Sequence, residues 1–204
     1  MSSTFLDAIT TRTDSGSRTT EQIGAVLFIT VLTAIAAQIS IPLPFTPVPF
    51  TLQPMVVLVG AAALGSRLGL ASQVLYLALG LAGLPVFAAS AALPQGAARL
   101  IGPTGGYLMS YPFAAFATGW LAERGFDRRY VTAVLAMVCG LVLIFAGGVS
   151  WLMIGSQTSL GLSAALAAGF YPFAIADFAK LLVASGVMPA LWKITGRADQ
   201  RTER

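Results

Sequence analysis

The sequence predicts an all-α integral membrane protein with six transmembrane helices and ordered extracellular lid loops. Hydrophobic residues form 56% of the 204 residues and charged residues only 10%, which is more apolar surface than a water-soluble domain of this length can bury. The apolar segments have the lengths of membrane-spanning helices and are separated by glycine, proline and charged residues. Residues 1–21 contain no apolar stretch of the kind that a cleavable signal requires, so they are expected to form a cytoplasmic tail.

Six segments have the composition of membrane spans, namely residues 22–41, 54–66, 68–83, 104–122, 130–153 and 172–192. A five-span alternative would fuse the second and third into one helix of about 30 residues, which is longer than a bilayer requires. Six spans are favoured because the sequence from Gly65 to Gly69 contains Arg67 between two glycines, which is typical of a turn. The predicted membrane domain therefore covers residues 22–193, between cytoplasmic tails at 1–21 and 194–204.

The basic residues orient these spans. With the N-terminus in the cytoplasm, every lysine and arginine except Arg99 and Lys180 lies on the cytoplasmic side, as the positive-inside rule expects. Every acidic residue except Asp177 falls in the cytoplasmic tails or in the loop after the fourth span. The outer half then contains two positive charges and one negative charge, a sum of plus one. These charges predict a multi-pass protein of the cell membrane, with both termini in the cytoplasm and an outer side that meets an anion.

Asp177 and Lys180 form a candidate functional pair within the last span. Their spacing of three residues places both side chains on one face of a helix, and this face is expected to look into the protein rather than toward lipid. Ionisable groups inside a bilayer cost several kcal/mol unless a function requires them. The alternative is a structural ion pair that ties two helices together.

Two connections on the outer side are rich in proline, which stiffens a backbone that cannot be helical. The first reads PLPFTPVPFTLQ from Pro42 to Gln53 and has no charge, so it is expected to fold down over a pocket. The second contains Arg99, for which the alternative is an ordinary solvated loop residue. The third outer connection, residues 155–171, is expected to contain a short helix that ends at Gly169.

The composition excludes several kinds of function. Cys139 is the single cysteine, it lies in an apolar segment, and histidine is absent, so disulfides, Cys/His metal sites and histidine-based catalysis are excluded. The basic residues cluster beside membrane spans, where orientation explains them, so no nucleic-acid partner is expected. The sequence has no G-x-x-x-x-G-K-[ST] loop. The chain is therefore expected to have no catalytic residue, no cofactor and no metal, and to hydrolyse no ATP itself.

Four motifs in the same order and spacing resemble those of a known family: PLPFTPVPFTLQ, YLALGLAGLPVF, GPTGGY and PFAIADFAK. They are similar to the biotin-specific, BioY-type substrate-capture subunits of energy-coupling-factor (ECF) vitamin transporters, and the resemblance extends from about Ala25 to Trp192. It implies six helices and an outward-facing biotin pocket capped by the outer loops. It also implies delivery through a transmembrane coupling subunit and two ABC-type ATPase subunits. The Asp-x-x-Lys element of this family falls on Asp177 and Lys180.

The residues and the resemblance together predict how biotin is held. Biotin has a fused ring with a ureido group and a carboxylate tail. Arg99 and Lys180 are the cations available for the tail, and the guanidinium is the better geometric match for a carboxylate. Asp177 is expected either to accept hydrogen bonds from the ureido N–H groups or to hold Lys180 in place. Further polar candidates are Gln53, Thr104 and Tyr107, and candidates for packing against the ring are Phe45, Phe50, Tyr76 and Phe87, for which lipid or core packing is the alternative.

Two further expectations concern partners and mechanism. The family presents an Ala-x-x-x-Ala surface on its first helix for the coupling subunit, and the nearest match here runs from Thr33 to Ala37, where threonine is still small enough for close helix approach. The alternative function is a stand-alone, proton-coupled secondary transporter of a small carboxylate, with Asp177 as the proton site. Against it, the sequence has no inverted repeat between its halves and no second acid within a span.

Overall fold

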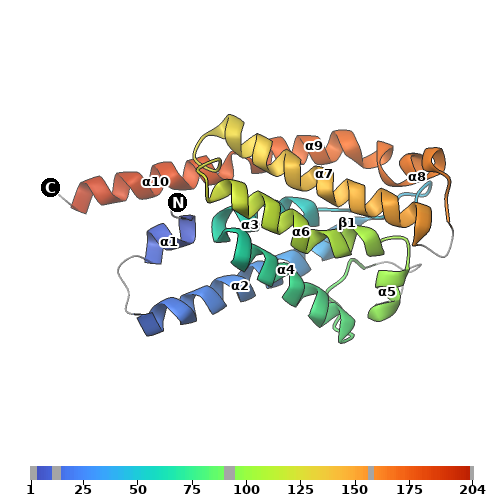
Figure 1. Ribbon diagram of the computed structural model, residues 1–204, viewed down its shortest axis with the longest axis horizontal. Coiled ribbons are helices and arrows are strands. Elements are labelled where there is room, and N and C mark those ends of the chain that lie inside the picture. The colour runs from blue at the N-terminus through green and yellow to red at the C-terminus, as the bar shows by residue number, and fades with distance from the viewer. Residues whose placement is uncertain (1–3, 11–14, 90–94, 156–158, 203–204) are drawn as a thin grey trace.

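The computed structural model describes residues 4–10, 15–89, 95–155 and 159–202, which form a bundle of helices and one short β-ribbon. In chain order the elements are α1 (Phe5–Thr10), α2 (Ser15–Gln38), β1 (Ser40–Ile41), β2 (Phe50–Thr51), α3 (Gln53–Leu64), α4 (Ser66–Leu81), α5 (Ala97–Ile101), α6 (Gly105–Ala122), α7 (Tyr130–Ile154), α8 (Leu162–Gly169), α9 (Tyr171–Ala184) and α10 (Val187–Thr202). Figure 1 shows both termini at one end of the elongated bundle and α5 and α8 at the other end. We call these the termini end and the α5/α8 end.

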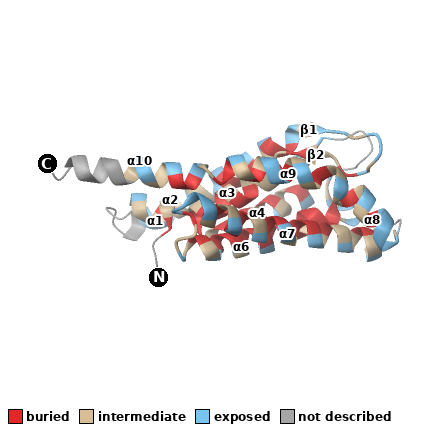
Figure 2. Ribbon diagram, turned by 90° about the horizontal axis from the view of Figure 1, so that it is seen from above, coloured by how far each residue is buried: buried red, intermediate tan, exposed pale blue. Residues whose placement is uncertain are grey.

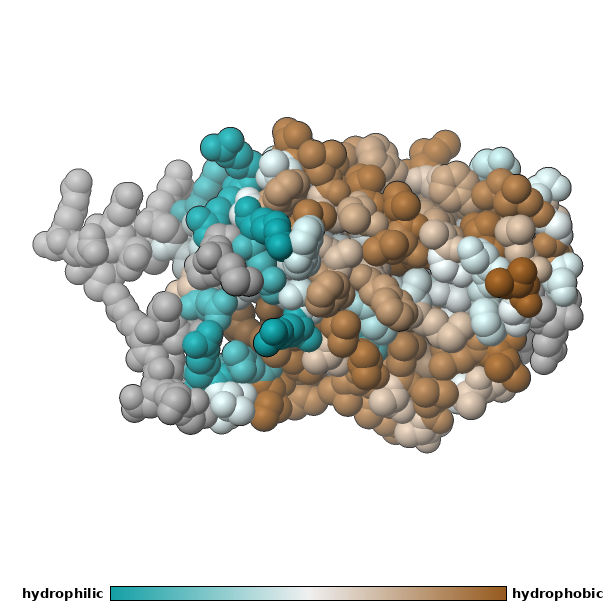
Figure 3. Space-filling view, viewed as in Figure 1, coloured by the Kyte–Doolittle hydropathy of each residue, from teal (hydrophilic) through white to brown (hydrophobic). Residues whose placement is uncertain are grey.

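Three helical stretches of the described residues are long and apolar enough to cross a bilayer, namely Arg18–Gln38, Tyr130–Ile154 and Tyr171–Thr195. Helix α3 is apolar but shorter. On the face shown in Figure 3, hydrophobic residues cover the middle of the molecule and hydrophilic residues gather at the termini end. Figure 2 shows buried residues on the inner sides of the helices and exposed residues on the outer sides. The chain is thus a helical membrane protein, as its composition predicts.

The predicted break between the second and third spans is a turn of one residue. Helix α3 ends at Leu64 and α4 begins at Ser66. Gly65 between them has φ 86° and ψ 179°, a backbone conformation that is open essentially to glycine alone. Glu123, from the connection after α6, accepts hydrogen bonds from the N–H of Ser66 at 2.7 Å and from its hydroxyl at 2.8 Å, which caps the start of α4.

The last predicted span, residues 172–192, lies within the apolar helical stretch Tyr171–Thr195, in which a short turn at residues 185–186 separates α9 from α10. Helix α9 ends at Ala184 and α10 begins at Val187, and the N–H of Ser185 closes α9 by donating to the Leu181 carbonyl at 2.8 Å. Pro189 gives the physical reason, because it has no N–H to continue the helix and suits the first turn of a new one. Helix α10 then continues to Thr202, past the predicted start of the C-terminal tail at residue 194.

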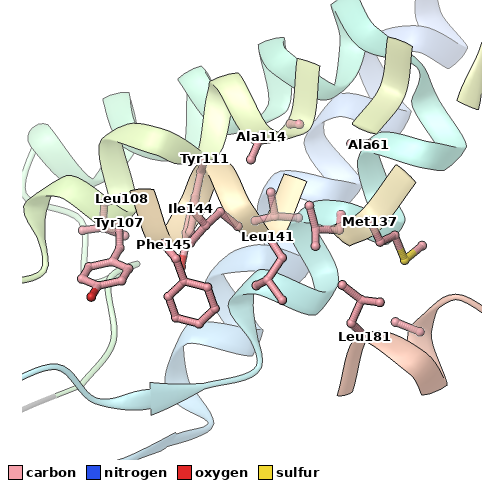
Figure 4. Packing of buried hydrophobic residues seen from close by; sticks show 14 of the residues in the cluster. Ala61, Tyr107, Leu108, Tyr111, Ala114, Met137, Leu141, Ile144, Phe145 and Leu181 are labelled. Atoms are coloured by element: carbon pink, nitrogen blue, oxygen red, sulfur yellow. The ribbon is translucent and has the colours of Figure 1, made fainter. Parts of the chain in front are cut away.

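The bundle core is centred on α6 and α7, which form the most extensive helix pair. In Figure 4, Tyr107 and Tyr111 of α6 lie beside Ile144 and Phe145 of α7. Gly148 of α7 leaves the space that the Tyr107 ring fills, since a Cβ there would lie 2.2 Å from ring atoms. The core thereby fixes the orientation of α6 side chains at the α5/α8 end.

Short elements order the connections between the long helices. Strands β1 and β2 pair antiparallel, with Ser40 opposite Thr51 and Ile41 opposite Phe50, so the two ends of the first connection are held together. Helix α8 confirms the short helix predicted before the last span, including its end at Gly169. Pro172 lies in the first turn of α9, where its missing N–H costs nothing.

Candidate functional site

A pocket lies where the first two connections meet α3, α6, α7 and α9. It contains about 590 Å³ of space that no atom occupies, including its opening to solvent. Most of its lining is apolar or aromatic with a few polar groups, which is the usual composition of a small-molecule site. The lining residues are Val48, Pro49, Thr51, Gln53, Pro54, Phe87, Ala88, Arg99, Thr104, Tyr107, Leu108, Tyr111, Ile144, Phe145, Phe173 and Asp177.

Arg99 is the cation of this pocket. Helix α5 places its side chain inward, and only 1% of the residue is exposed. One guanidinium N–H donates to the carbonyl of Ala88 at 2.5 Å, whereas the buried Nε has no hydrogen-bond partner among the residues that the structure describes. Burial lowers the pKa of this guanidinium. Among the described residues no carboxylate forms an ion pair with Arg99, so the pocket wall contains an uncompensated positive charge.

Three more polar groups surround the pocket. The buried hydroxyl of Thr104, at the start of α6, has no hydrogen-bond partner in the described part of the chain. The amide of Gln53 donates to the hydroxyl of Tyr76 at 2.7 Å, and the hydroxyl of Tyr107 donates to the carbonyl of Gly169 at 2.7 Å. Buried polar groups are normally paired. A hydroxyl and a guanidinium nitrogen in one pocket that both lack a partner among the described residues are therefore candidates for contact with a polar ligand.

Asp177 and Lys180 form a close ion pair on α9. Lys180 Nζ lies 2.5 Å from an Asp177 carboxylate oxygen, with 15% and 9% of the two side chains exposed. Phe173, Asp177, Leu181 and Ala184 are all buried, which confirms that this face of the helix looks into the protein. Asp177 lines the pocket, whereas Lys180 does not.

Lys180 instead lines a second, smaller cavity, which lies next to the Asp177–Lys180 ion pair. This cavity contains about 240 Å³ of unoccupied space and lies between α3, α7 and α9. Asp177 and Pro54 line both spaces, so the ion pair stands at the boundary between them. Asp177 therefore contributes its carboxylate to the wall of the larger pocket, and the ammonium group of Lys180 contributes only to the wall of the smaller cavity.

The structure brings together most of the predicted polar residues. Gln53, Arg99, Thr104, Tyr107 and Asp177 line one pocket although they come from four helices and a span of more than half the chain. That they bind a ligand stays a prediction.

The predicted ring-packing residues are more scattered. Phe87 is fully buried and lines the pocket. Tyr76 is fully buried behind the pocket, in edge contact with Phe87 at 5.5 Å between ring centroids. Phe50 stacks on Phe173 at 6.4 Å, just outside the lining residues. Phe45 is 67% exposed and lies away from the pocket, because its part of the first connection faces outward.

Several lining residues were not among the site residues predicted from the sequence. Tyr111 follows Tyr107 by one helical turn, and Phe173 precedes Asp177 by one turn, so helical spacing could have found both. Ile144 and Phe145 come from the middle of a uniformly apolar helix, and no local signal separates them from lipid-facing neighbours. Thr51 is a polar residue of the first connection whose carbonyl and hydroxyl both form hydrogen bonds.

The residues expected to dock a partner are inaccessible here. Thr33 and Ala37 are both fully buried, and the Thr33 hydroxyl accepts a hydrogen bond from the Gln73 amide of α4 at 3.4 Å. Their helix packs this small-residue face against α4, within the subunit. The exposed side of α2 instead presents large apolar side chains, among them Phe28 and Ile35.

These features define a class: a helical membrane protein with a mostly apolar pocket, whose lining includes a carboxylate and an arginine that has no ion-pair partner among the described residues. The sequence model of the BioY family matches residues 9–197, so this chain belongs to the BioY family.

Individual relatives agree with this assignment. The chain is 39% identical over 165 residues to the biotin transporter BioY of Thermotoga maritima, covering 81% of this chain and 92% of that protein. It is 35% identical over 164 residues to the probable biotin transporter BioY of Pyrococcus horikoshii, covering 80% and 91%. The crystal structure of the S-component for biotin from an ECF-type ABC transporter matches with a TM-score of 0.77 and 26% identity, over 89% of this chain and 95% of that one.

Proposed function

We propose that this chain captures biotin in the pocket and delivers it for uptake as the substrate-specific subunit of an ECF-type transporter. Relatives named as biotin transporters, and the similar fold of an S-component for biotin, support the proposal. The observation on which it depends most is Arg99, a buried cation that has no acidic partner among the described residues and lies in the wall of a ligand-sized pocket. A ligand carboxylate supplies the missing charge.

The chemistry of the lining fits the other parts of biotin. The carboxylate tail pairs with the guanidinium of Arg99, which offers parallel N–H donors. Asp177 and Gln53 are acceptors for the ureido N–H groups, and Thr104 is a donor for the ureido oxygen or the carboxylate. Phe87, together with the aromatic side chains of α6 and α7, gives an apolar surface for the fused ring.

The proposed topology has six membrane crossings in the cell membrane, made by α2, α3, α4, α6, α7 and the α9–α10 pair. The membrane domain then covers residues 22–193, with the tails 1–21 and 194–204 in the cytoplasm. The hydrophilic residues at the termini end support this orientation, because Arg124, Arg128 and Arg129 lie in the connection between α6 and α7 at that end. The pocket then opens outward, with the first two connections as its lids.

The proposed role is binding without catalysis. A transmembrane coupling subunit and two ABC-type ATPase subunits supply the energy for uptake, and the chain itself needs no cofactor. Among the described residues, no group of three or more His, Cys, Asp and Glu side chains has the geometry of a metal site.

Calorimetry on the purified chain with a panel of vitamins tests the substrate. Biotin alone is expected to give a saturable heat with a dissociation constant well below the micromolar range, and other vitamins none. A response to another vitamin in place of biotin, or no response to biotin, would reject the proposal.

A further inference from the structure

On the basis of the proposed biotin site, we infer that Lys180 is a positioning residue. It fastens the first connection onto α9 and so controls how long the ligand is retained, while the ligand carboxylate pairs with Arg99. Lys180 and Arg99 are the two cations near the pocket, and their surroundings assign them these different roles.

The ammonium group of Lys180 contacts three groups at once. It lies 2.5 Å from an Asp177 oxygen, donates to the backbone carbonyl of Thr51 at 2.6 Å, and lies 3.8 Å from the centroid of the Phe50 ring. Asp177 is on its own helix, whereas Phe50 and Thr51 form strand β2 at the end of the first connection. We call this set of contacts the Lys180 latch.

The latch extends into the pocket wall through side chains. The Thr51 hydroxyl donates to Gln53 at 3.4 Å, the Gln53 amide donates to the Tyr76 hydroxyl at 2.7 Å, and that hydroxyl donates to the carbonyl of Val86 at 3.0 Å. Val86 is in the second connection, next to Phe87 of the pocket lining. A single series of polar contacts therefore links α9 to both connections that close the pocket.

Lys180 and Arg99 differ in whether a neighbouring acidic residue compensates their charge. The charge of Lys180 is already compensated by Asp177, and withdrawing the lysine toward a ligand would leave a buried carboxylate without its partner. Arg99 has no acidic partner among the described residues and lines the pocket, which Lys180 does not. A carboxylate that enters the pocket is thus attracted to Arg99. The contacts of the Lys180 latch stay in place while the ligand is bound.

A comparison of biotin with biotinamide, in which a neutral amide replaces the carboxylate, distinguishes the two roles. Lys180→Met is expected to weaken both ligands by the same factor, about tenfold or more, with the change in the dissociation rate constant rather than in the association rate constant. Arg99→Gln is expected to weaken biotin strongly and biotinamide much less, because the neutral amide loses a hydrogen bond but no charge pair. Lys193→Met, an exposed lysine of α10, is the matched control and is expected to change neither.

Two further variants show whether the effect of Lys180→Met comes from the lost latch or from misfolding of the protein. Lys180→Arg preserves the charge and the donor and should restore slow dissociation. Asp177→Asn combined with Lys180→Met removes both charges, and it should dissociate both ligands at least as fast as the single lysine variant. Loss of the Lys180→Met effect with biotinamide would overturn the inference, because it would mean that the lysine contacts the carboxylate. An unchanged dissociation rate in Lys180→Met would overturn it as well.

Hydrogen exchange of the ligand-free protein tests the latch without biotin. Lys180→Met is expected to accelerate amide exchange in residues 42–53, and Lys193→Met is not. Equal exchange in the two variants would reject the latch, even if biotin binds. Faster exchange in a chain that fails to bind biotin would reject the proposed substrate and leave the latch intact.

Discussion

Arg99 is the residue whose environment most needs an explanation. Its guanidinium is held in a pocket wall at 1% exposure, with one backbone carbonyl as its described hydrogen-bond partner. A buried charge without a counter-ion destabilises a fold by several kcal/mol. A ligand that supplies a carboxylate removes this cost on binding. The free energy that folding loses at Arg99 is then recovered as affinity and as specificity for acids.

Asp177→Asn tests the acidic side of the pocket. The variant is expected to bind biotin about tenfold more weakly or worse, a loss of about 1.4 kcal/mol, because an amide is a poorer acceptor for ureido N–H groups and no longer balances Lys180. The measurement is calorimetric titration of the purified variant, with Asp7→Asn at the termini end as the same change elsewhere. Wild-type affinity in Asp177→Asn would leave the pair with a structural role only.

Asp127, in the connection between α6 and α7, gives a prediction for the pH dependence of stability. Its carboxylate is buried, and burial raises its pKa, although the hydrogen bond from the Trp192 indole at 2.6 Å acts in the opposite direction. A carboxyl group with a raised folded-state pKa favours folding most when protonated. The stability of the wild type should therefore fall as the pH rises from about 3.9, the ordinary value, through the raised one.

The variant Asp127→Asn isolates this effect, because its amide can still accept the indole hydrogen bond. Thermal unfolding in detergent should show the variant gaining stability relative to the wild type as the pH rises from acid to neutral. A difference between the two proteins that is constant over this range would contradict the prediction.

The sequence predicted the polar residues of the pocket more accurately than its apolar residues. Charged residues are rare in this chain, so Arg99, Asp177 and Lys180 stood out by position alone, and two of them line the pocket. Lys180 does not line the pocket but donates to the carbonyl of Thr51, a contact over 129 residues of sequence that no local pattern could reveal. Phe45 and Phe50 have equivalent surroundings in the sequence, yet one is exposed and the other packs on Phe173, because only the folded connection decides which ring turns inward.

At the scale of elements, the Gly65 turn is the most demanding backbone position between two predicted spans. In Gly65→Ala, the added Cβ would lie 2.7 Å from the Glu123 carboxylate and from a Thr4 methyl group, in a backbone conformation that side chains avoid. The expected loss of stability is about 1–3 kcal/mol, measured by thermal or denaturant unfolding in detergent. Gly24→Ala in α2 has no atom within 4 Å of the new Cβ and is the control, with stability unchanged or up to about 1 kcal/mol higher. Equal stability of the two variants would contradict this account of the turn.

The helix ends that were predicted from glycine residues agree with the structure. The turn at Gly65 was predicted from its glycine and charge, and α8 from the glycine that ends it. The turn after Ala184 was not predicted, because residues 172–192 contain one continuous apolar stretch apart from Asp177 and Lys180. Proline inside an apolar stretch removes one backbone donor whatever the hydropathy, so it is the more reliable indicator of a helix start.

At the scale of the whole molecule, we expect this chain alone to bind biotin, and uptake into the cell to require its partner subunits as well. Cells that express the chain with its coupling and ATPase subunits should accumulate labelled biotin. Cells that lack those subunits should bind biotin at the membrane without accumulating it, because this chain has no nucleotide-binding loop. Accumulation by the lone chain in ATP-free vesicles, abolished by a protonophore, would instead support a proton-coupled carrier with Asp177 as its proton site.

The most direct measurement is a calorimetric titration of biotin into the wild type, Arg99→Gln and Arg129→Gln. Arg129 is an exposed arginine at the termini end, so the two variants lose the same charge at opposite ends of the molecule. We expect Arg129→Gln to bind like the wild type and Arg99→Gln to bind at least about tenfold more weakly. Equal affinity in all three proteins would contradict the central claim, that a buried, unpaired arginine receives the carboxylate of the ligand.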